Sequence, residues 1–309
     1  SDFFGPHGTE TAVLGERYPD NRVAAALARR LSGLAELGRD ARINLVATAT
    51  QANGEPHYAL SAGGTMGGGD FTLAYTATGS PFAPTMIDVD LTAENKDGAA
   101  LLALYGLPTL PLVDAGPATT ELTLKGAPDK GLETHGKLSG DTATAAFDGT
   151  VTVLPETVTA QGKARIEGAD LEPWLGAAGV TLPGMGLGIP AELAADLTLL
   201  PEHLKIGNLD GSIGEVALSG DLTATIANGV PHLAGTMATD FLPLDSALAL
   251  VLGEGTLQGD GTAWANSAFP PRVTAPFTAD LGLKAGAVGW GVDTVATDAA
   301  MQARLTSEG

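Results

Sequence analysis

The sequence contains no cysteine, and this absence excludes disulfides, thiolate metal sites and cysteine nucleophiles. Aromatic side chains are also scarce, at 5% of the 309 residues, whereas glycine occurs 42 times. A core of this composition has to be built from small and aliphatic side chains. The lack of cysteine is compatible with an extracytoplasmic compartment.

Basic residues are few, since 16 lysines and arginines face 36 acidic residues and leave a net charge of −20. The six arginines among residues 1–42 are balanced there by six acids, so the whole net charge belongs to residues 43–309. Such a charge repels phosphate backbones and anionic lipid surfaces. Nucleic acid is therefore not expected as a partner.

No hydrophobic run is long enough to cross a bilayer. The longest uncharged apolar stretch with helical character, 99–113, has 15 residues and is broken by Pro108 and Pro111, whereas a span needs about 20. The chain also has no initiator methionine, basic n-region or cleavage signal. We interpret it as a piece of a longer protein or a processed product.

The first 42 residues differ from the rest. Glycine and proline punctuate residues 1–20, which we expect to be irregular. Asp20 or Asn21 can then cap an amphipathic helix that ends at Gly38. We expect this helix to pack on a neighbouring sheet rather than lie on a membrane surface. Its apolar positions fall at helical spacing: Val23, Leu27, Leu31, Leu34 and Leu37.

From Ile43 onward, apolar and polar residues alternate with period two, and turn residues interrupt them every 8 to 12 positions. Clear examples are 71–75, 87–91, 158–166 and 216–226. This pattern predicts a mainly β fold with an antiparallel sheet, one face apolar and the other solvated. Tight hairpin turns are expected at four dipeptides: Asn53-Gly54, Asp148-Gly149, Asp210-Gly211 and Asn228-Gly229.

A strand that runs into a short helix recurs along the chain. Its fullest copy is 161–179, and its helical half returns at 97–106 and 245–253. The opening aspartates Asp97, Asp170 and Asp245 lie 73 and 75 residues apart, and such a period indicates repeats. We interpret Asp170 as a helix cap and Trp174 as an anchor. The predicted organisation is a segment 1–42 with its helix, β units of about four strands and a helix at 43–113, 117–186 and 190–255, and a partial unit at 256–309.

Chemistry-bearing motifs are weak. The five histidines are scattered, so each is expected to be solvated or hydrogen-bonded rather than a metal ligand. The glycine-rich stretch 63–70 occurs once, which favours a hairpin turn over a calcium-binding repeat. No nucleophile elbow or dinucleotide fingerprint is present. Asp88 and Asp90 could serve glycoside hydrolysis, but alternating acids are typical of a solvated strand face. We expect no cofactor, no metal site and no enzymatic activity.

One β unit carries the strand Leu-Ser-Gly-Asp-Leu-Thr-Ala-Thr at 218–225, the turn Asn-Gly-Val-Pro at 228–231 and a run to Leu-Pro-Leu-Asp at 232–245. In these motifs the β units resemble the AsmA-like family of bacterial envelope proteins. Residues 117–180 and 43–108 look like further copies. The resemblance implies an elongated, strongly twisted sheet folded as an open groove with an apolar inside. It also implies a periplasmic location, an N-terminal anchor in the inner membrane that this chain lacks, and phospholipid as the cargo.

In that case the apolar strand positions would face lipid, and small residues such as Ala160, Gly162, Ala164 and Ala224 would leave width for acyl chains. The function expected from the resemblance is non-enzymatic sheltering of acyl chains for inter-membrane lipid transport or outer-membrane assembly. Two alternatives stay open: an extracytoplasmic structural or adhesive β-solenoid or closed sandwich that binds partners through its acidic face, and a carbohydrate-active enzyme. The lipid-facing candidates are Phe71, Leu73, Tyr75, Ile87, Val89, Leu91, Val158, Ile166, Leu197, Leu199, Val216, Leu218, Leu222 and Ile226.

Overall fold

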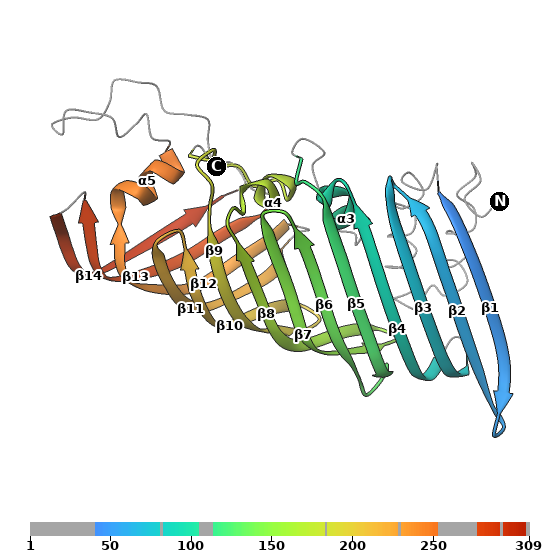
Figure 1. Cartoon of the computed structure of the whole chain (residues 1–309). Coiled ribbons are helices and arrows are strands. Elements are labelled where there is room, and N and C mark those ends of the chain that lie inside the picture. The colour runs from blue at the N-terminus through green and yellow to red at the C-terminus, as the bar shows by residue number, and fades with distance from the viewer. Residues whose placement is uncertain are drawn as a thin grey trace. The chain divides into compact units, whose positions relative to one another are not determined.

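A computed structural model describes residues 41–80, 83–104, 114–182, 184–227, 230–252, 277–290 and 293–306. Fourteen strands form one mainly antiparallel sheet, in which they follow one another in sequence order from β1 to β14 (Figure 1). The predicted mainly β fold is thus confirmed. The predicted N-terminal helix lies outside the described residues, and the four-strand repeat and the open groove stay predictions.

The strands have 9 to 14 residues. The first eight are β1 (Arg42–Ala52), β2 (Glu55–Met66), β3 (Gly69–Ser80), β4 (Ala83–Asn95), β5 (Ala118–Ala127), β6 (Gly131–Gly140), β7 (Ala143–Leu154) and β8 (Thr157–Gly168). The other six are β9 (Ala191–Leu199), β10 (His203–Ile213), β11 (Val216–Ala227), β12 (Val230–Pro243), β13 (Thr278–Trp290) and β14 (Asp293–Leu305).

In the described part of the chain three short helices interrupt the strands, each after a fourth strand: α3 (Gly98–Leu104), α4 (Glu172–Ala177) and α5 (Leu244–Leu252). The Asp97 Oδ1 atom accepts the backbone N–H of Ala99 at 2.9 Å, and Asp170 Oδ1 accepts that of Glu172 at 2.9 Å. Both aspartates therefore stabilise the first turn of a helix, and Asp245 lies within the first turn of α5. Over the described part of the chain, no helix has the length and apolarity to cross a membrane.

The chain divides into two compact units. In its described part, unit 1 comprises residues 41–141, 145–162 and 199–201, and therefore holds β1 to β6 with most of β7. Unit 2 comprises residues 142–144, 163–198 and 202 onward, and holds β10 to β14.

One strand pair departs from the antiparallel meander. Strands β12 and β13 pair in parallel, with Leu233 opposite Ala279 and Met237 opposite Leu283. A parallel pair requires a crossover connection of a dozen or more residues. Residues 244–277, which begin with α5, provide that length. The expectation of antiparallel pairing throughout is therefore wrong at this point.

Two of the four predicted turns are wrong. Asn53 and Gly54 do form the turn between β1 and β2, with φ values of 55° and 83°, and Asn228-Gly229 lies outside the described residues. Asp148-Gly149 and Asp210-Gly211, however, lie inside β7 and β10. A Cβ atom on Gly149 would meet the carbonyl oxygen of Gln161, and one on Gly211 that of Glu192. These glycines permit a close approach of two strands rather than a change of chain direction.

The described residues contain little conventional core. Ten of their fifteen buried apolar side chains are alanines, and Leu101 of α3 is the one large side chain that is completely enclosed. Helix α3 contacts β4 and β5, and α5 contacts β12 and β13. Burial is therefore concentrated where a helix meets the strands, and most large apolar side chains of the sheet lie elsewhere.

Candidate functional site: the apolar face of the sheet

Alternate residues of β1 to β6 form one apolar face, because the strand register places apolar residues opposite other apolar or small residues. Leu73 of β3 lies opposite Leu91 of β4, and Leu91 lies opposite Leu122 of β5. Tyr75 similarly lies opposite Leu60 on one side and Val89 on the other. We call the following set the unit 1 apolar face: Ile43, Leu45, Tyr58, Leu60, Phe71, Leu73, Tyr75, Ile87, Val89, Leu91, Leu122, Leu124, Leu132 and Leu138.

This face is neither enclosed nor fully exposed. Leu132 is buried and Leu45 is 60% exposed, but most members of the set are half-buried. Partial burial raises the pKa of the Tyr75 phenol above its ordinary value of 10.0, because the phenolate loses hydration there. The face is thus a partly dehydrated apolar surface that water still reaches.

All six lipid-facing candidates of β3 and β4 lie on this face, side by side across one strand pair. Their cross-strand neighbours are often small: Phe71 lies opposite Gly64 and Ala93, and Ile87 lies opposite Ala77 and Gly126. Sequence alternation identifies the six large residues. It does not identify their small partners, since these are set by register.

In unit 2, Val216, Leu218 and Leu222 of β11 lie on a comparable face. Leu222 lies opposite Ile206 and Gly235, and Gly235 lies opposite Leu281. The candidate Ile226 lies at the end of the same strand and is 74% exposed. Helix α5 covers another part of this face, where Leu242, Ala285 and Val288 form a buried cluster. Further apolar residues pack against that cluster: Leu244, Ala247, Leu283, Ala299 and Met301.

The remaining candidates are divided between the two units. Val158 of β8 is half-buried in unit 1, whereas Ile166 of the same strand is 38% exposed in unit 2. Leu197 of β9 is half-buried in unit 2, and Leu199 is 37% exposed in unit 1. The structure does not bring these four residues together within one unit.

The interpretation of Gly162 as open width is wrong. A Cβ atom on Gly162 would lie 2.9 Å from Cε2 of Phe147, and one on Gly149 would lie 2.8 Å from Cζ of the same ring. Phe147 therefore covers both glycines, as aromatic rings do where glycine weakens a strand. Phe147 belongs to the apolar surface, and the expectations did not include it.

The opposite face of unit 1 carries the charges. Lys125 Nζ lies 3.0 Å from Asp88 Oδ2, and this hydrogen-bonded partner raises the pKa of Lys125 above 10.5. Lys125 in turn lies opposite Glu133 of β6. Asp88 is thus part of an alternating ladder of charges on an exposed face, which agrees with the expected solvated face rather than with a carboxylate pair for glycoside hydrolysis.

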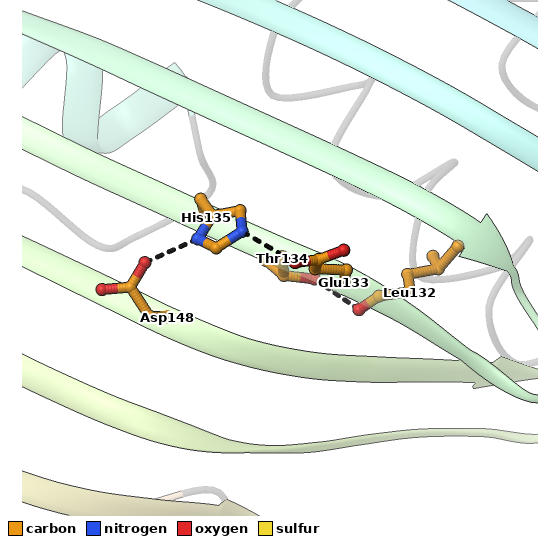
Figure 2. Close-up of polar contacts among 5 residues, drawn as sticks. All are labelled: Leu132, Glu133, Thr134, His135 and Asp148. Atoms are coloured by element: carbon orange, nitrogen blue, oxygen red, sulfur yellow. Dashed lines mark hydrogen bonds and ion pairs between the residues drawn. The ribbon is translucent and has the colours of Figure 1, made fainter.

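His135 of β6 connects Glu133 of its own strand to Asp148 of β7 (Figure 2). Its Nδ1 atom lies 2.6 Å from Asp148 Oδ1 of β7, and its Nε2 atom lies 3.4 Å from Glu133 Oε1. The bond to Asp148 and then that to Glu133 raise the pKa of His135 above its ordinary value of 6.5. The prediction of a hydrogen-bonded histidine is confirmed here. No group of three metal-ligating side chains occurs among the residues with described positions.

The titration of His135 provides a direct test of this pairing. Because the folded chain holds the proton more tightly than the unfolded chain, the stabilisation is present below about pH 6.5 and is lost as the pH rises through the raised pKa. We expect an NMR titration midpoint above 6.5. Asp148→Asn should lower this midpoint more than Glu133→Gln. Equal midpoints in all three proteins would contradict the contact.

A hollow of about 500 Å³ lies where the ends of several unit 1 strands meet. Its lining is mixed, and its polar part includes Asp70, Glu94, Asn95, Lys96 and Asp141. The buried Asn95 amide is satisfied, because Nδ2 donates to Gly67 O at 3.0 Å and Oδ1 accepts the Asp97 N–H at 2.9 Å. The amide therefore connects the β2–β3 turn to the start of α3, and this structural role explains its burial.

In comparisons with known proteins, no family model, curated protein or solved structure matches the chain.

Proposed function

We propose that this chain is a non-enzymatic, periplasmic segment of an AsmA-like envelope protein, and that it shelters phospholipid acyl chains on the apolar face of its sheet. One observation supports this most: large apolar side chains are aligned across six strands yet remain half-exposed. The AsmA-like motifs at 218–245 support the family, the periplasmic location and the role in inter-membrane lipid transport or outer-membrane assembly.

The dimensions of the unit 1 apolar face suit an acyl chain. Six strands at a spacing of about 4.8 Å make it roughly 24 Å wide. Soluble proteins seldom leave such a contiguous apolar surface exposed without a ligand or partner. Each methylene that leaves water contributes roughly 0.8 kcal/mol, so a dozen methylenes provide enough free energy for binding even if contact is incomplete.

The apolar face and the charged face favour different ligands. A lipid headgroup carries phosphate, which the acidic face repels, whereas an acyl chain is uncharged. Binding through acyl chains therefore agrees with a net charge of −20. An adhesive role would instead use the acidic face and a basic partner.

Binding of a fluorescent phospholipid to the purified, delipidated chain tests the proposal. We expect a stable complex in gel filtration and a lipid adduct in native mass spectrometry. A phospholipid with the same headgroup but six-carbon chains should bind much more weakly, by up to about fourfold per lost methylene. Failure of both lipids to bind, or equal affinity for both, would contradict acyl-chain sheltering.

A further inference from the structure

Strand β1 lies at one edge of the sheet, and its own residues carry few of the features that protect an edge. All eleven of its side chains are exposed, and β2 is its partner strand among the described residues. Exposed edges are templates for strand addition, and proteins usually protect them with charges, prolines or bulges. From Ile43 to Ala52 the strand has no charge and no proline, and its register with β2 has no shift.

The other edge strand, β14, has features that protect an edge against strand addition. It carries Asp293, Asp298 and Arg304. Asp298 has a positive φ of 51°, and the pairing of β14 with β13 contains a register shift. Both features distort a strand that would otherwise accept a partner. The two edges therefore differ in their capacity for strand addition.

The residues around β1 also carry little of the negative charge that makes two copies of this chain repel each other. From β1 to the end of β3, the charged side chains are Arg42, Glu55 and Asp70, a formal net charge of −1. The whole chain carries −20. Two copies that meet at β1 thus approach through a margin of low net charge, where like-charge repulsion is small.

We infer that two copies of this chain pair antiparallel through β1, about a two-fold axis at Ala47. Residues that face each other across antiparallel strands point to the same side of the sheet. A symmetric pair must therefore match odd positions with odd positions and even with even. Full overlap of the eleven residues puts the axis at Ala47 and places Arg42 opposite Ala52, with no like charges in contact.

This register has a consequence for the apolar face. Leu45 of one copy lies beside Ala49 of the other, and both copies turn their apolar faces to the same side. The pairing extends the unit 1 apolar face into one surface shared by two chains. A two-fold contact closes after two copies, whereas pairing of β1 with β14 would produce open filaments. The inference stands independently of the proposed lipid function.

On the polar side of the sheet, Val46 of each copy faces Thr48 of the other copy. Both are exposed, with Val46 at 64%, so substitutions there leave the fold of one copy intact. The edge is about 37 Å long, which is small for a specific interface, so we expect a dissociation constant on the order of 10 µM.

Sedimentation equilibrium of the full chain across this concentration range tests the pairing. The unchanged chain should dimerise, Val46→Lys with Thr48→Lys should weaken the dimer at least about tenfold, and Val46→Lys with Thr48→Glu should restore it. Val295→Lys on β14 is the matched control and should leave the dimer unchanged. Circular dichroism verifies that each variant is folded. A monomeric unchanged chain, oligomers beyond the dimer, a dimer insensitive to the two lysines, or no restoration by the glutamate would each overturn the inference.

Discussion

Replacement of Leu73 and Leu91 together by glutamine is expected to lower the affinity for phospholipid about tenfold. The two leucines face each other across β3 and β4 at the centre of the unit 1 apolar face. Glutamine has a similar size but is polar, so an acyl chain on it gains less from leaving water. The loss of about two methylene contacts corresponds to roughly 1.6 kcal/mol, which is slightly more than a factor of ten in affinity.

The strand pair provides a matched control on its other face. Thr72 and Thr92 also face each other, one position along each strand from the leucines, and both are exposed. The variant Thr72→Gln with Thr92→Gln should bind lipid as the unchanged chain does. Fluorescence titration measures the affinities, and urea unfolding verifies that both variants fold. Equal loss in the two variants, or loss in neither, would contradict a lipid site on the apolar face.

Gly64→Ala is expected to destabilise unit 1 by about 2 to 4 kcal/mol. Gly64 of β2 has a φ of +155°, and a Cβ atom there would overlap the carbonyl oxygen of Arg42 and lie 2.9 Å from its carbonyl carbon. These are backbone atoms of β1, which cannot rotate away as a flexible side chain can. The strain is relieved only if β1 separates from β2, so hydrogen exchange should increase first in β1.

The adjacent glycine is the control. A Cβ atom on Gly63 would lie 3.5 Å from Phe71 O and 3.9 Å from Thr72 Cγ2, which are ordinary contact distances. Gly63→Ala should therefore change the stability by less than about 1 kcal/mol. The two variants differ by one position and by the face of the strand. A similar urea midpoint for both would show that the close approach at Gly64 is wrong.

The strands themselves could be predicted because their signal is local. In 71–75, 87–91 and 216–226 the alternation of apolar and polar residues indicates on which face of the strand each residue lies. This assignment does not depend on which strand pairs with it. The short helices were also predictable, since Asp97 and Asp170 stabilise their first turns through hydrogen bonds two residues away. The period-two alternation of the strands and the capping of the helices both depend only on residues that are close in sequence.

The candidate site could be predicted only in part. Phe71, Leu73 and Leu91 were identified from alternation, but Phe147 was not, because its role depends on Gly149 and on Gly162 of the next strand. The contact of His135 with Asp148 likewise depends on β6 lying beside β7. No local pattern states which residues of two strands face each other.

The sequence by itself determined a mainly β chain with one apolar and one charged strand face, because period-two alternation acts within a single strand. Tertiary structure alone decided the register, the parallel pairing of β12 with β13 and the use of Gly149 and Gly211 inside strands rather than in turns. An Asp-Gly dipeptide suits a hairpin turn and a close strand approach equally well. The choice between them depends on which backbone lies opposite, and that is a property of the assembled sheet.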